Sequence, residues 1–168
     1  QGYRGVCNVQ DNDFEFVRLY LNGSHYRTST TRVERNTLTR CNSSSTGMFL
    51  NIYNGYSNGT ADSVRLIISN NSINGQAQTS NSGYGIYANF NNEPVSLEIR
   101  NNAIQATRYG IYVNSTKSSK AIIENNTIDS AYSYGVYLNR VSGRISENTI
   151  TNSGWSSGWG MYLDSDFN

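Results

Sequence analysis

The chain has 168 residues, a formal net charge of +1 and only 15% charged residues, so it carries no basic stripe of the kind that binds nucleic acid. Its polarity comes from Asn, Ser, Thr and Gly, and with a single Pro this composition favours many short strands joined by turns over helices. No apolar run approaches the roughly 20 residues that a membrane-spanning helix needs.

A four-residue phrase, apolar–aromatic–apolar–Asn or Asp, occurs six times along the chain. Aromatic residues of successive copies lie 29, 38, 25, 25 and 25 residues apart, and Gly precedes every copy except the first. The copies begin at Leu19, Met48, Ile86, Ile111, Val136 and Met161. A period in the twenties indicates one structural unit stacked on itself.

A second phrase alternates with the first and has the form apolar–x–polar–Asn–x–apolar. Its fourth position is Asn in all six copies: Asn12, Asn36, Asn71, Asn102, Asn126 and Asn148. We expect these residues to stack as a ladder at an inward-facing bend, where their amides would satisfy backbone groups that the turn leaves unpaired.

The two phrases together predict a right-handed parallel β-helix, a single all-β domain over residues 1–168 with about six rungs of 22–25 residues. Residues 52–65 and 74–84 carry extra Gly, Ser, Asn and Gln and are predicted to be inserted loops. A β-helix needs its open ends covered, so we expect a segment of a longer chain, or ends covered by partner chains in a homo-oligomer.

Strand parity assigns a side to each residue of the first phrase. Ile111 and Val113 should point into the core and Tyr112 outward, because successive side chains alternate faces. The preceding Gly should permit a backbone angle closed to other residues. The same parity turns Cys7 inward as a buried thiol, with a Cys7–Cys41 disulfide as the alternative.

The segments 109–113 and 124–128 resemble the parallel β-helix repeats of the pectin-lyase-like superfamily, especially its NosD-like, periplasmic copper-processing members. The resemblance covers about residues 5 to 164. It implies the β-helix fold and a carbohydrate setting outside the cytoplasm: extracellular, at a cell or virion surface, or in the periplasm. No catalytic motif of the superfamily's enzymes matches a position in this chain, so no functional residue is carried over.

Outward aromatic residues are the main candidates for ligand contact. A row of flat rings would suit sugar rings, with Asn and Ser close enough to bond hydroxyl groups; the alternative is that the tyrosines stack on one another and stiffen the sheet. The candidate carbohydrate-binding residues are Tyr87, Tyr112, Tyr137 and Tyr162 on the ladder, and Tyr53 and Tyr56 in the first inserted loop.

Acidic residues near the start of the chain are the candidates for a metal. Asp11, Asp13 and Glu15 alternate, so in a strand they would share one face and could hold calcium; an acidic end that prevents edge-to-edge pairing is the alternative. His25 has no second His or nearby Cys and is predicted to be a surface residue. Calcium aside, no cofactor is expected.

Other charged residues offer no aligned pair of acids. Asp164 and Asp166 alternate at the far end of the repeats. Glu124 is expected one turn above Arg100, with Glu98 beside it, as exposed cross-strand ion pairs of small energetic value.

Three functions are consistent with this pattern. The first is a non-catalytic module that contacts a polysaccharide or glycan surface, as in the stem of a spike, fibre or adhesin. The second is a polysaccharide lyase, glycoside hydrolase or epimerase with its cleft on the inserted loops. The third is a purely structural filament or scaffold. Because no catalytic constellation is visible, the sequence favours the first.

Overall fold

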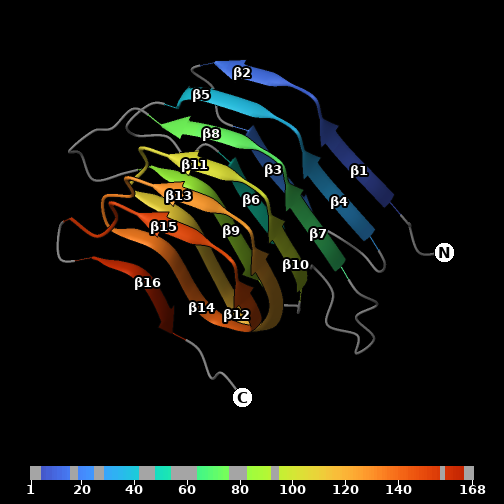
Figure 1. The fold of residues 1–168 in the computed structure, drawn as a ribbon. Helices are drawn as coiled ribbons and strands as arrows, with labels where there is room; N and C mark the ends of the chain where they lie inside the picture. Colours follow the sequence, from blue (N-terminus) through green and yellow to red (C-terminus); the bar gives the residue numbers. More distant parts are fainter. Residues whose placement is uncertain are drawn as a thin grey trace.

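The structure, a computed structural model, describes residues 5–15, 19–24, 29–41, 48–53, 64–75, 83–91, 95–155 and 158–164. Every regular element in these ranges is a β-strand, and every strand pair is parallel. The strands form successive circuits, with the first and last described strands at opposite ends of the stack (Figure 1). The chain is therefore a parallel β-helix, as its repeats predict. The described residues include no helix that could cross a membrane.

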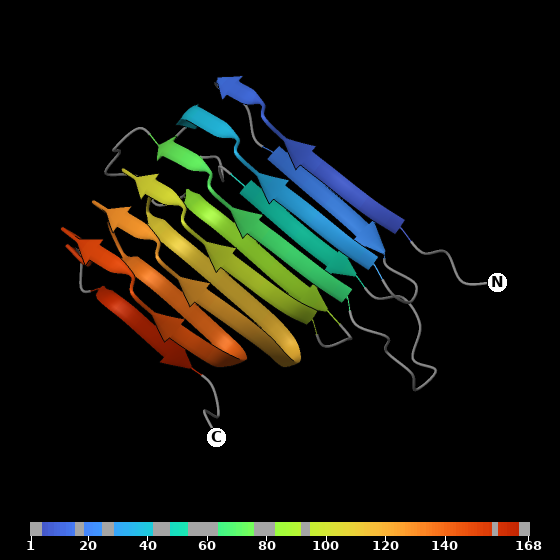
Figure 2. The same cartoon turned by 45° about the vertical axis from the view of Figure 1, so that its right-hand side comes forward.

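Each circuit has three sides, and strands of one side run side by side in the same direction (Figure 2). The charged side consists of β1 (Gly5–Gln10), β4 (Ser29–Glu34), β7 (Val64–Ser69), β10 (Val95–Arg100) and the C-terminal halves of β12 (Tyr109–Glu124) and β14 (Tyr134–Ser146). The short-strand side consists of β2 (Asp13–Glu15), β5 (Thr37–Cys41), β8 (Ser72–Gly75), β11 (Ala103–Gln105), β13 (Thr127–Asp129) and β15 (Thr149–Thr151). The tyrosine side consists of β3 (Leu19–Ser24), β6 (Met48–Tyr53), β9 (Tyr84–Asn91), the N-terminal halves of β12 and β14, and β16 (Trp159–Asp164).

The strand register reproduces the spacing of the first phrase. Each aromatic residue of the phrase pairs with the aromatic residue of the next copy on the neighbouring strand. In order these residues are Tyr20, Phe49, Tyr87, Tyr112, Tyr137 and Tyr162. Of the predicted loops, residues 54–63 and 76–82 lie outside the described residues, whereas their flanks at 52–53, 64–65, 74–75 and 84 are strand residues. The longer spacings of 29 and 38 residues therefore leave the pairing of the strands unchanged.

The core is a column of apolar side chains enclosed by the three sides. Val33, Ile68, Ile99 and Ile123, one per rung of the charged side, have no exposed surface. Full burial of each such side chain stabilises the fold by about 1.5–3 kcal/mol. Ile111 and Val113 are buried and Tyr112 is half-buried on the outer surface, so the predicted parity is confirmed.

The predicted asparagine ladder is present at the corner between the charged and short-strand sides. The backbone N–H and Nδ2 of Asn71 both donate to Oδ1 of Asn102, at 3.0 and 2.9 Å, and Nδ2 also donates to the carbonyl of Val33 at 2.9 Å. The same bonds join the other ladder residues: Asn12 to Asn36, Asn36 to Asn71, Asn102 to Asn126 and Asn126 to Asn148. The ladder thus satisfies carbonyl groups that the corner buries.

The residue before each ladder Asn has a left-handed backbone conformation. The φ angles are 59° at Asp11, 56° at Arg35, 57° at Asn70, 55° at Asn101, 55° at Asn125 and 56° at Glu147. Asn and Asp tolerate this conformation better than other side chains do. This one residue turns the chain sharply enough to place the Asn inward.

The expectation for the Gly of the first phrase is wrong. Gly85, Gly110 and Gly135 do not have positive φ angles. They are required instead by close approach of neighbouring rungs, because a Cβ at Gly110 would lie 2.5 Å from the carbonyl oxygen of Gly135 and 2.5 Å from Cγ2 of Ile128. The missing side chain, not the backbone angle, is what the stack needs here.

The expectation that Cys7 is buried is also wrong. Cys7 lies opposite Thr31 and shares the inward parity of Val9, but its side chain is exposed and its thiol is free. Its strand, β1, pairs only with β4 among the described strands, so no second neighbour covers it. The side chain of Cys41 lies outside the described residues.

Candidate functional site

The tyrosine side carries two columns of stacked rings. In the column of the first phrase, ring centroids are 5.3 Å apart between Tyr87 and Tyr112, 4.5 Å between Tyr112 and Tyr137, and 5.1 Å between Tyr137 and Tyr162. A second column, three residues earlier in each strand, contains Tyr84, Tyr109 and Tyr134. The columns meet edge to face, for example between Tyr109 and Tyr112 at 5.5 Å and 78°.

This stacking determines what the tyrosines present outward. Interplanar angles within the first column are only 5° to 18°, so each interior ring covers the faces of its neighbours. The column therefore presents ring edges and phenol hydroxyls to the outside, not the row of flat faces that the sugar-platform hypothesis assumed. Mutual stacking, the alternative considered from the sequence, is the observed arrangement.

Burial in the columns also raises the pKa of the phenols. Burial raises the pKa of Tyr84, Tyr87, Tyr112 and Tyr137, and at Tyr112 the neighbouring Tyr137 raises it further. A phenol with the ordinary pKa of 10.0 is already protonated at neutral pH, and the raised pKa extends this state to more alkaline pH. The hydroxyls therefore act as hydrogen-bond donors as well as acceptors.

A second asparagine ladder follows the tyrosines on the same face. Nδ2 of Asn114 donates to Oδ1 of Asn89 at 2.9 Å, and Nδ2 of Asn139 donates to Oδ1 of Asn114 at 2.8 Å. Asp164 occupies the next position in register. Each of these side chains lies two residues after a column tyrosine, so both series line the same outer surface.

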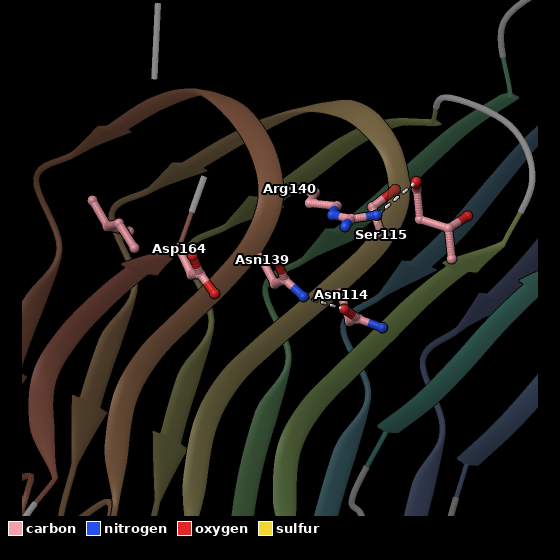
Figure 3. Close-up of a pocket in the computed structure, with 7 residues that line it drawn as sticks. Asn114, Ser115, Asn139, Arg140 and Asp164 are labelled. Carbon is pink, nitrogen blue, oxygen red and sulfur yellow. Dashed lines mark hydrogen bonds between the residues drawn. The ribbon is translucent and has the colours of Figure 1, made fainter. Parts of the chain in front are cut away.

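The second ladder ends in a polar groove at the corner between the tyrosine and charged sides. The groove has a volume of about 570 Å³ and is lined by Asn114, Ser115, Thr116, Asn139, Arg140, Leu163 and Asp164. Figure 3 shows Asn114, Asn139 and Asp164 in a row, with Arg140 on the adjoining bend. Arg140 is exposed, has a φ of 54°, and Nη1 donates to the Thr116 carbonyl at 3.4 Å.

The sequence analysis did not identify this groove. The sequence shows the repeated Asn of the first phrase, but it was considered there only as a hydrogen-bonding neighbour of the aromatic row. Arg140, Ser115 and Thr116 fall at a bend whose geometry no repeat phrase specifies. Of the sequence-predicted residues, the structure brings Tyr137 and Tyr162 close to this groove through Asn139 and Asp164. Tyr56 lies outside the described residues, as does the side chain of Tyr53.

The three acidic candidates for calcium do not lie in one strand. Asp11 lies at the corner with a φ of 59°, outside β2, and its carboxylate accepts two bonds from Arg35, at 2.6 and 2.8 Å. Only Asp13 and Glu15 alternate within β2. The described residues contain no group of three His, Cys, Asp or Glu side chains placed to hold a metal. His25 and Asp166 lie outside the described part of the chain.

The acids of the charged side are paired with arginines, as predicted. Arg100 pairs with Glu124 and, at 3.3 Å, with Glu98, which also accepts a bond from Nε of Arg65 at 2.9 Å. Glu124 also pairs with Arg144. The prediction that these pairs are exposed is wrong for Glu124, which is only 5% exposed because the side chains of adjacent rungs cover it.

Three parallel sides, a buried asparagine ladder and repeated surface groups define a β-helix repeat protein. A scan against protein-family models matched residues 30–166 to NosD, described as a periplasmic copper-binding protein, and the chain belongs to this family. Searches of curated proteins and of solved structures found no match. The periplasmic location in the family description agrees with the predicted location outside the cytoplasm.

The residues of this chain were compared with the copper that the family description names. Copper is held by Cys, Met and His donors. The whole sequence has one His, two Cys and two Met. Of these, the described side chains are those of Cys7 in β1 and Met161 in β16, strands at opposite ends of the stack. The described residues therefore do not fit a copper centre.

Proposed function

We propose that the chain is a non-catalytic module, located outside the cytoplasm, that contacts carbohydrate polymers along its tyrosine side. The observation that carries the proposal is the groove between Asn114 and Asp164, which continues the tyrosine columns with amide, hydroxyl, guanidinium and carboxylate groups. This contact is proposed through hydrogen bonds rather than through stacking of sugars on tyrosine faces.

The chemistry of the groove is suited to hydroxyl-rich ligands. A sugar hydroxyl donates one hydrogen bond and accepts others, and an Asn amide offers both functions from one planar group. Arg140 adds a charged donor and Asp164 a charged acceptor, and bonds to charged groups are roughly twice as strong as neutral ones. The repeated amides supply the same contact on successive rungs, as an extended polymer requires.

Contact is favoured over cleavage by the distribution of the acids. Among the described residues that line the groove, Asp164 is the single carboxylate, whereas hydrolysis of glycosidic bonds commonly uses two. Of the other described acids, Glu98 and Glu124 are bound to arginines on the charged side. The groove thus supports binding better than acid–base chemistry.

The test is titration of the protein with neutral and uronic-acid polysaccharides by calorimetry, with Arg140→Ala and Tyr137→Phe as variants. Tyr137→Phe removes one hydroxyl and leaves the ring stack. We expect each to weaken binding by roughly 2- to 10-fold, the equivalent of one hydrogen bond. Lys120→Ala, an exposed cation on the charged side, is the control and should bind as the wild type does.

Two results would contradict the proposal. One is the absence of binding to every polysaccharide tested. The other is binding that Arg140→Ala and Lys120→Ala reduce equally, which would indicate nonspecific attraction between charges. Release of new reducing ends during the titration would favour a hydrolytic function instead.

A further inference from the structure

The second asparagine ladder changes its chemistry between two described rungs. Nδ2 of Asn114 donates to Oδ1 of Asn89, and Nδ2 of Asn139 donates to Oδ1 of Asn114, so each of these amides donates to the preceding rung. The position that follows Asn139 in register is Asp164. An ionised carboxylate has no hydrogen to donate, so Oδ1 of Asn139 has an acceptor as its neighbour where Asn89 and Asn114 each meet a donor.

No side chain in the described ranges relieves this mismatch. The side-chain bond of Asn139 is the one that it donates to the rung below, and no ion pair joins Asp164 to a described cation. Arg140 lines the same groove, but its Nη1 donates to the Thr116 carbonyl on the preceding rung, and Figure 3 shows its side chain directed away from Asp164. The groove therefore has a cationic end and an end that offers only acceptors.

The mismatch lies where two successive corners of the stack differ in length. After the pair of Asn114 with Asn139, residues 115–118 of β12 face Arg140 of β14 alone. The groove lies at this difference, and both Asn139 and Asp164 line it. The two neighbouring acceptors can therefore be reached by a ligand in the groove.

A group that bridges two neighbouring acceptors must carry at least two hydrogens or a positive charge. A sugar hydroxyl has one hydrogen, which satisfies one of the two oxygens and leaves the other. A protonated amine has three hydrogens, and its hydrogen bond to a carboxylate is roughly twice as strong as a neutral one. Calcium takes roughly six to eight oxygen ligands, whereas the described residues contain no group of three His, Cys, Asp or Glu side chains placed to hold a metal. The acceptor pair therefore favours an amine.

We propose that the groove selects carbohydrate polymers that carry free, protonated amino groups, with an ammonium group bound between Oδ1 of Asn139 and the carboxylate of Asp164. This inference rests on the proposed function, because it names the class of sugar that the tyrosine side contacts. The amides on the preceding rungs bind hydroxyls of neighbouring sugars, and Asp164 supplies the selectivity for the amine.

The test compares oligomers of glucosamine, which carry free amines, with oligomers of N-acetylglucosamine of equal length, which do not. Calorimetry at about pH 5.5 keeps amines protonated and carboxylates ionised. We expect the wild type to bind the glucosamine oligomer roughly three- to ten-fold more tightly. Asp164→Asn should bind both oligomers alike, because it removes the charge and places at this position the amide of the preceding rungs. Glu147→Gln removes the same charge from an exposed residue at another corner, so this control should keep the wild-type preference.

A second measurement tests the mismatch without any ligand. Asp164→Asn supplies the missing donor to Oδ1 of Asn139, so it should raise the urea concentration at the midpoint of unfolding. Glu147→Gln should leave that midpoint unchanged. A midpoint that Asp164→Asn lowers or does not move would show that the carboxylate already has a donor in the ladder, and it would overturn the proposal.

The possible outcomes separate this inference from the proposed function. Equal binding of the two oligomers by the wild type, or an equal loss of preference in Asp164→Asn and Glu147→Gln, would overturn the amine assignment and leave carbohydrate contact in place. Calcium binding that Asp164→Asn abolishes, without any preference for glucosamine, would assign the site to a metal ion instead. Binding of neither oligomer nor of any other polysaccharide would contradict the proposed function itself.

Discussion

The rings of Tyr112 and Tyr137 stack with centroids 4.5 Å apart and an interplanar angle of 5°. Strands in a sheet are separated by about 4.8 Å, so the backbone sets nearly the distance at which two aromatic rings stack. A tyrosine at the same position of each rung therefore stacks without bending the strands. The column follows from the repeat and needs no ligand to order it.

Stability should fall at alkaline pH because of these columns. Burial raises the pKa of Tyr84, Tyr87, Tyr112 and Tyr137 in the folded state above the ordinary 10.0, so the unfolded chain loses these protons first as the pH rises. The protonated tyrosines contribute fully to the free energy of unfolding below about pH 10, and this contribution is lost as the pH rises through their folded-state pKa. Urea unfolding between about pH 8 and about pH 11 measures this, and Tyr137→Phe should show a shallower decline.

Gly110→Ala should destabilise the protein by about 1–3 kcal/mol because the added methyl would overlap the Gly135 carbonyl and Ile128. Gly160→Ala, in the same column on the last described strand, is the matched control. Its nearest neighbour would be Cγ2 of Ile150 at 3.9 Å, an ordinary contact, so its effect should stay within about 0.5 kcal/mol. Equal losses in chemical denaturation would refute the close-approach explanation.

Asn102→Ala should cost at least about 3 kcal/mol, since it removes bonds to the carbonyls of Ile68 and Arg100 and leaves Asn71 without its acceptor. Asn102→Asp keeps the acceptor but removes the donors, and should also destabilise strongly. Asn12→Ala, at an exposed ladder position, should cost only about 0.5–1.5 kcal/mol because water can replace its bonds. Thermal unfolding of the three variants tests this order.

Glu124→Gln should lower the free energy of unfolding by about 1–3 kcal/mol, because the buried carboxylate holds Arg100 and Arg144 and accepts a bond from Ser146. Glu147→Gln, an exposed acid on the following corner, should change stability by less than about 0.5 kcal/mol. The comparison is made by urea unfolding at low protein concentration. A loss at Glu124 no larger than at Glu147 would show that the buried network contributes little.

The fold was predictable from the sequence because a parallel stack places each residue opposite its counterpart one repeat later. Spacings of 25 residues thus fixed the register of Tyr87, Tyr112 and Tyr137 before the strands were seen. The predictions that failed depend on neighbouring rungs. Gly110 is crowded by the next rung, Glu124 is covered by adjacent rungs, and Cys7 has a neighbour on only one side among the described strands.

The groove was not predictable for a related reason. Its lining includes a bend at Arg140 with a φ of 54°, and no repeated phrase includes that bend. Asp11 shows the same limit, since alternation with Asp13 suggested a shared face until the left-handed corner separated them. Periodicity describes straight segments well and corners poorly.

The second asparagine ladder also places the same amide group at regular intervals along the stack. Asn89, Asn114 and Asn139 repeat this group at the strand spacing of about 4.8 Å. A long ligand displaced by one rung along the stack would therefore meet the same kind of amide again. For the carbohydrate polymer proposed above, these three amides would give a few nearly equal registers, between which it could shift without full release. Asp164 occupies the next position in register, where a carboxylate replaces the amide, so the row of identical groups ends there.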